Sequence, residues 1–66
     1  MGAQIINRGR GPEIEGTRIT VYNVMDYLQE GWRYDQIAGL FRLPPDDIQV
    51  AIAYIEAHKE EVMTAY

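Results

Sequence analysis

The stretch DQIAGLFRLPPDDIQVAIAYIE, residues 35–56, contains two helical patterns of apolar residues with two prolines between them. The first pattern predicts a short helix over residues 35–41. Pro44 stops it, because proline lacks an amide proton and disfavours helix in the residue before it. The small Ala38 lies where two crossing helices would approach most closely. We therefore predict a helix-turn-helix with Arg42 at the turn position where glycine is usual; an ordinary three-helix cluster is the alternative.

The second pattern predicts the longest helix of the chain. Pro45 suits its first position, and Asp46 and Asp47 complement the positive end of the helix dipole. Because no glycine or proline follows Pro45, we expect this helix to continue to about Glu60, with Met63 as its furthest end.

An earlier helix is expected over residues 20–30. Thr20 is a good N-cap, because its hydroxyl can accept a hydrogen bond from a free amide of the first turn. Gly31 is placed to end the helix. Its apolar residues recur at the spacing of one helix face: Val21, Val24, Met25 and Leu28.

Residues 4–19 are interpreted as a short strand, a turn and a second short strand. The first strand contains Ile5 and Ile6, and the glycines and the proline of residues 9–12 end it. The second extended piece covers residues 13–19 and includes a turn at Gly16-Thr17. Two strands alone are barely stable in water, so this ribbon must pack on helices or pair with a second chain. The predicted fold is mostly α, with a β ribbon before a three-helix unit over residues 20–63.

The 66 residues allow a single domain, 1–66, that buries only about 60% of the surface of the unfolded chain. The chain has no cysteine and only one histidine, so neither disulfides nor a metal can supply the missing stability, and self-association remains. No apolar run approaches the roughly 18 residues of a membrane span, and MGAQIINRGR lacks the apolar stretch of a signal peptide. We expect a cytoplasmic protein without a membrane partner.

The segment GRGPEIEGTRITV, residues 9–21, resembles the glycine-proline and GTRI signature that opens the bacterial domain-of-unknown-function family 433. LQEG at 28–31, the segment 34–37 and LPPDDIQVAIAYI at 43–55 agree in order and spacing, so the resemblance covers about residues 4–62. Arg10 and Thr20 depart from the glycine and proline that are common there. The resemblance implies a homeodomain-like fold, genomic pairing with a PIN-type ribonuclease toxin, and an antitoxin role for some members. It implies no catalytic residues.

The longest predicted helix is apolar on two sides. One side should face the other helices: Ile48, Ala51, Ile52, Ile55 and Val62. The second is a candidate interface with another subunit or a partner protein: Val50, Ala53, Tyr54 and Ala57. In so short a chain only another protein can cover that second side, which favours a homodimer. The alternative is that the alanines are neutral on a helix surface and Tyr54 lies along it.

The net charge of −4 is unevenly spread, because the basic character lies in the N-terminal third at Arg8, Arg10 and Arg18. An arginine-glycine arm can enter a narrow minor groove of DNA. The alternative is that these arginines are solvated or pair with Glu13 and Glu15. In the longest helix only Gln49 suits a base edge, and the acids at its start oppose a phosphate backbone.

No spacing of residues indicates catalysis, a metal site or a cofactor. His58 has no second histidine or cysteine to complete a metal site, and we expect Trp32 and Tyr34 to seal the core. Our first hypothesis is a non-enzymatic antitoxin-type adaptor that dimerises and binds a PIN-type ribonuclease toxin, without a small-molecule substrate. The alternatives are a DNA-binding transcriptional regulator that uses the basic arm, and a purely structural homo-oligomer.

Overall fold

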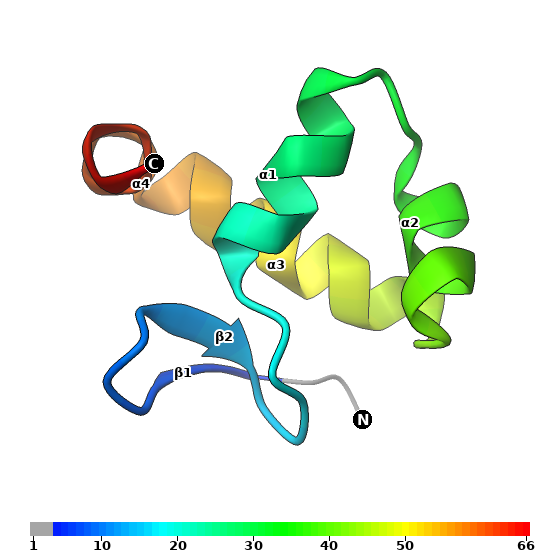
Figure 1. Ribbon diagram of the computed structural model, residues 1–66, viewed down its shortest axis with the longest axis horizontal. Helices are drawn as coiled ribbons and strands as arrows, with labels where there is room; N and C mark the ends of the chain where they lie inside the picture. Colours follow the sequence, from blue (N-terminus) through cyan, green and yellow to red (C-terminus); the bar gives the residue numbers. More distant parts are fainter. Residues whose placement is uncertain (1–3) are drawn as a thin grey trace.

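The computed structural model describes residues 4–66, so residues 1–3 of the expected single domain lie outside the described residues. The chain is mostly helical and begins with a two-stranded antiparallel sheet, as predicted (Figure 1). The elements in chain order are β1 (Ile5–Asn7), β2 (Pro12–Ile14), α1 (Val21–Gln29), α2 (Tyr34–Phe41), α3 (Pro45–Ala57) and α4 (Lys59–Ala65). No helix of residues 4–66 is both long enough and apolar enough to cross a membrane.

The two strands form a hairpin in which Ile5 pairs with Ile14 and Ile6 pairs with Glu13. Neighbouring residues of a strand point to opposite faces of the sheet. Ile14 is fully buried and lies on the face toward the core, so Glu13 lies on the opposite face. The predicted second strand over 13–19 is wrong in its bounds. β2 begins at Pro12 and ends at Ile14, and a turn follows in which the amide of Ile14 donates to the carbonyl of Ile19 over 2.9 Å.

The predicted boundaries of α1 are confirmed by its capping bonds. The Oγ1 atom of Thr20 accepts from the amide of Asn23 at 3.3 Å, and the amide of Thr20 donates to Oδ1 of Asn23 at 2.9 Å. These reciprocal bonds satisfy amides that have no partner inside the helix. At the other end Gly31 has a φ of +91°, a conformation that glycine adopts without a steric penalty.

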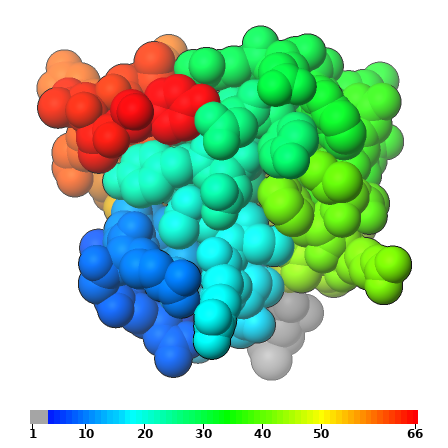
Figure 2. Space-filling view, in the orientation of Figure 1, coloured from blue at the N-terminus to red at the C-terminus, as the bar shows by residue number. Residues whose placement is uncertain are grey.

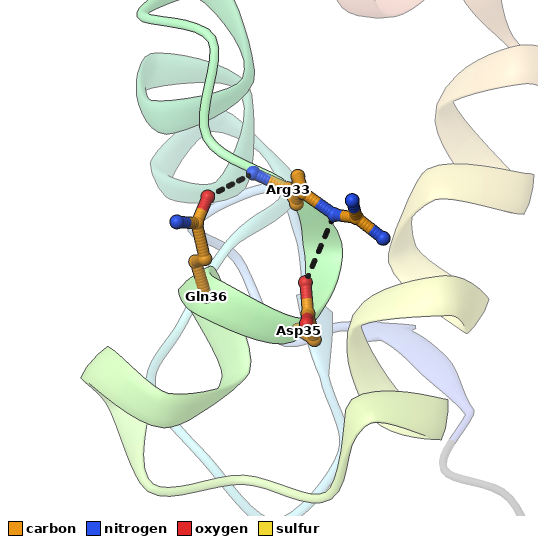
Figure 3. A network of polar contacts seen from close by, with 3 residues as sticks. All are labelled: Arg33, Asp35 and Gln36. Atoms are coloured by element: carbon orange, nitrogen blue, oxygen red, sulfur yellow. Dashed lines mark hydrogen bonds and ion pairs between the residues drawn. The ribbon is translucent and has the colours of Figure 1, made fainter.

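Helix α2 begins one residue before the predicted start, at Tyr34, and the residue before it carries the capping contacts. The amide of Arg33 donates to Oε1 of Gln36 at 2.8 Å, and the Arg33 guanidinium lies 3.5 Å from an Asp35 oxygen (Figure 3). Both charged side chains are mostly exposed, so this ion pair contributes little stability.

The connection from α2 to α3 is tight. Arg42 adopts the left-handed conformation, with φ 60° and ψ 43°, and the amide of Leu43 donates to the carbonyl of Ala38 at 2.9 Å. Pro44 follows, and Pro45 is the first residue of α3, as predicted. Ala38 is 1% exposed, which agrees with a close approach of α2 to its neighbours.

The expected continuous helix from Pro45 to Glu60 is wrong. Helix α3 ends at Ala57, His58 leaves the helical conformation with φ −122° and ψ 37°, and α4 starts at Lys59. In Figure 1 α4 is seen nearly end-on, whereas α3 crosses the picture behind α1, so the two helices point in clearly different directions. The described chain therefore has four helices instead of the predicted three.

One core joins all the helices to the hairpin. Its buried members are Ile14, Val21, Val24, Met25, Ile37, Ala38, Ile48, Ala51, Ile55 and Val62. Four of the five residues of the predicted core side of the long helix belong to it, and Ile52 is partly buried against it. Trp32 and Tyr34 are only partly buried; Trp32 meets the ring of Tyr27 edge-on, with the ring centres 5.0 Å apart.

Candidate functional site

Helix α3 exposes one continuous stripe along its length, which we call the α3 face: Asp46, Gln49, Val50, Ala53, Glu56 and Ala57. All of these residues are exposed except Val50, which is partly buried. Their spacing of three, four and seven positions places them on one side of the helix, opposite the buried Ile48, Ala51 and Ile55. The middle of the face is small and apolar, and acids lie at both ends.

The candidate interface residues of the sequence do not all lie together. Val50, Ala53 and Ala57 belong to the α3 face, whereas Tyr54 turns to the side of the helix and packs on the core. The Tyr54 ring stacks on the His58 imidazole and, with Tyr22, Gly11 and Pro12, lines a cavity of about 240 Å³ between α3, α4 and the hairpin. The chain itself therefore covers part of Tyr54. The apolar surface of α3 that is left for a partner is smaller than the sequence suggested.

The three candidate arginines of the N-terminal third surround one concavity. Arg8 and Arg10 lie in the turn between β1 and β2, Arg18 lies in the turn after β2, and all are exposed. Figure 2 shows the surfaces of these two segments, blue and cyan, side by side. The cavity measures about 490 Å³, and Glu13, Gly16 and Thr17 complete its lining. Gln49, the fourth candidate, is exposed on α3 and does not line it.

Glu13 is the functional candidate that the sequence reasoning missed. Its side chain is only 2% exposed, and its Oε2 atom is buried without a hydrogen-bond partner among residues 4–66. Of the two alternatives for the arginines, ion pairs with Glu13 or Glu15 do not form among residues 4–66, where the single pair within 4.0 Å joins Arg33 to Asp35. All three arginines are exposed, which agrees with the other alternative, that they are solvated. The alternation of β2 places Glu13 away from the core, but nothing local in the sequence indicates that this side is covered.

Tyr66, the residue that follows α4, makes one further polar contact. The hydroxyl of Tyr66 donates a hydrogen bond to Oδ1 of Asp26 on α1. This bond raises the pKa of Tyr66 above its ordinary value of 10.0, with smaller contributions from desolvation and from the charges of Asp26 and Glu30. The described residues hold no group of three or more histidine, aspartate or glutamate side chains arranged to bind a metal ion.

Comparison with known proteins places the chain in a family. The family described as "Protein of unknown function (DUF433)" matches residues 7–55, which is well over half of the chain. No curated protein and no solved structure matches it. The matched segment includes the hairpin turn, the arginine cavity, α1, α2 and most of α3. The chain therefore belongs to the DUF433 family.

Proposed function

We propose that this protein is a non-enzymatic adaptor that binds a basic protein partner through the α3 face. The acidic and apolar make-up of that face carries the proposal. Helix α3 contains Asp46, Asp47 and Glu56 and no lysine or arginine, so its exposed side attracts positive charge. A PIN-type ribonuclease toxin is the partner that the family resemblance implies. A nuclease that binds the phosphates of RNA presents such positive charge.

The shape of the α3 face suits a protein partner. Ala53 and Ala57 are exposed and small, so a partner helix or strand can approach the backbone of α3 closely. The acids at the two ends would form a polar rim around this apolar centre, which is the usual arrangement of a protein interface. Complementary charge would speed the encounter and disfavour acidic competitors.

The same face argues against a DNA-reading role for α3. The arrangement of α2, the left-handed Arg42 and α3 fits a helix-turn-helix, in which the second helix enters the major groove. In such a complex Asp46 and Asp47 would meet the phosphate backbone, and phosphate contacts supply much of the affinity for DNA. We therefore propose that this family member uses a helix-turn-helix for protein recognition, in the cytoplasm.

We further propose that the chain dimerises. Leu40, Met63 and Tyr66 are the large apolar side chains that residues 4–66 leave exposed, at 47%, 50% and 45%. A domain of this size buries little surface by itself, and a second copy over some of these residues would add to it. Sedimentation equilibrium at several concentrations measures the mass; a monomer throughout contradicts dimerisation and leaves the partner proposal standing.

Co-expression with a PIN-type ribonuclease, the partner that the family resemblance implies, tests the adaptor function. The tagged protein should capture the ribonuclease and inhibit its cleavage of RNA. Ala53→Arg puts a long cation into the centre of the α3 face and should abolish both effects, whereas Gln29→Arg adds the same charge at an exposed position of α1 and should change neither. Capture that survives Ala53→Arg, or no capture by the unmodified protein, refutes the proposal.

A further inference from the structure

The buried carboxylate of Glu13 is the least satisfied group of the described chain. It is the one buried polar or charged residue among residues 4–66, and its Oε2 atom has no hydrogen-bond donor in that range. A buried carboxylate without hydrogen bonds is costly, and native structures keep such groups mainly where they have a role. Glu13 also lines the arginine cavity, so a ligand seated there could bring the missing donor.

The charges around the cavity define what can enter it. Arg8, Arg10 and Arg18 contribute three positive charges and Glu13 one negative charge, which leaves an excess of two positive charges. Glu15 does not line the cavity. Guanidinium groups bind phosphate with paired, charge-assisted hydrogen bonds, so a dianionic phosphate matches both the excess charge and the donors.

We propose that this cavity binds a guanosine 5′-monophosphate group, with the arginines on the phosphate and Glu13 on the base. The Watson–Crick edge of guanine presents two neighbouring N–H donors, at N1 and N2, to a carboxylate. Adenine and cytosine place an acceptor beside their amino group, which would repel the second oxygen of Glu13. The volume of about 490 Å³ lies within the range of small-ligand sites, roughly 300–1,000 Å³.

Because of the position of the cavity, the proposed nucleotide binding is independent of the proposed adaptor function. Its lining comes from the hairpin and the turn after β2, whereas the α3 face belongs to residues 46–57. A guanosine 5′-phosphate group occurs as the free nucleotide and at the 5′ end of an RNA strand. Both offer the same phosphate and base to the cavity.

Titration of the ¹⁵N-labelled protein at low salt with GMP, AMP and inorganic phosphate tests the proposal. GMP should shift the amide signals of Arg8, Arg10, Gly16 and Thr17, which line the cavity, and should bind at least about fivefold more tightly than AMP. Inorganic phosphate should bind more weakly than both. A 5′-phosphorylated RNA that begins with guanosine forms a separate arm: tighter binding than GMP identifies the strand end as the source, and weaker binding identifies the free nucleotide.

Two variants separate the base contact from the phosphate contact. Glu13→Gln replaces one acceptor oxygen by a donor group of similar shape. Both nucleotides should still bind, but the ratio of the GMP affinity to the AMP affinity should fall to about one. Arg8→Ala combined with Arg10→Ala should weaken all three anions, and these residues lie in an exposed turn where they do not support the core. Arg33→Ala removes an exposed arginine of another surface and should change nothing.

The outcomes that overturn the proposal are equally specific. No shift of the cavity amides at millimolar GMP excludes a nucleotide site. Equal affinities for GMP, AMP and inorganic phosphate reduce the cavity to a surface that attracts any anion. If Glu13→Gln fails to fold, the double arginine variant still decides, because GMP binding that survives it contradicts the assignment of the phosphate contacts.

Discussion

The phenol ring of Tyr54 stacks on the imidazole of His58, with ring centres 4.1 Å apart and 19° between the ring planes. The Nδ1 atom of His58 also lies 3.1 Å from the carbonyl oxygen of Tyr54. These contacts occur where the chain leaves α3, although neither glycine nor proline is present there. The bend therefore has a cause other than the usual helix-breaking residues.

Burial of Val62 explains the bend better than the contacts of His58 do. Val62 is 2% exposed in α4, and burying a valine side chain contributes about 1.5–3 kcal/mol. A hydrogen bond such as that of the imidazole contributes about 0.5–1.5 kcal/mol net. Val62→Ser should therefore let α3 continue through position 58, whereas His58→Ala should keep the bend. The three-bond coupling between the amide and α protons of residue 58 reports its φ; loss of the bend in His58→Ala contradicts this explanation.

Gly11 cannot carry a side chain without disturbing the hairpin. Its φ is +102°, and a β-carbon would lie 2.9 Å from Cε2 of the Tyr22 ring. Gly11→Ala should lower the free energy of unfolding by about 1–3 kcal/mol, through backbone strain and this collision. Gly39→Ala is the control, because Gly39 lies in α2 with open space around its β-carbon position. That change should raise the free energy by about 0.5–1 kcal/mol in urea unfolding. Equal effects of the two changes would contradict this account of Gly11.

The features that the sequence predicted correctly depend on neighbouring residues. Thr20 caps α1, Gly31 ends it, and Pro45 begins α3, and each of these residues acts through its own backbone or through an amide a few positions away. The helical spacing of Ile48, Ala51 and Ile55 likewise requires only that one side of α3 faces the core.

The features that the sequence did not predict depend on residues far apart in the chain. We attribute the bend at His58 to packing of Val62 against core residues that lie far from position 58 in the sequence. The arginine cavity brings residues of two turns together with the buried Glu13, whereas carboxylates are almost always exposed in proteins. Tyr54 likewise has a covered side because the hairpin and α4 reach it.

The Thr20 cap should contribute measurably to stability. Thr20→Ala removes the acceptor for the Asn23 amide and should cost about 1 kcal/mol in the free energy of unfolding. Thr64→Ala makes the same chemical change at an exposed position of α4 and should alter stability by less than about 0.5 kcal/mol. A loss at Thr20 no larger than that at Thr64 would mean that the cap contributes nothing in this protein.

The hydrogen bond between Tyr66 and Asp26 makes the stability of the folded protein pH-dependent in the alkaline range. The folded protein holds the pKa of Tyr66 above the value of 10.0 that the free phenol has, mainly because the hydroxyl donates to the Asp26 carboxylate. A group whose pKa is raised on folding contributes stability that is fully present below its unfolded pKa. The contribution is lost as the pH rises through the folded pKa. The contact should therefore stabilise the protein at neutral pH and weaken above pH 10.

Ultraviolet absorbance of the tyrosinate measures this titration. Subtracting the curve of Tyr66→Phe isolates Tyr66 from the other tyrosines, and its midpoint should lie above 10.0 in the folded protein. Asp26→Asn removes the charged acceptor and should move the midpoint down toward 10.0. Asp35→Asn removes a carboxylate that pairs with Arg33 instead and should leave the midpoint unchanged. A midpoint of Tyr66 that does not respond to Asp26→Asn would show that α4 is not held to α1 by this bond in solution.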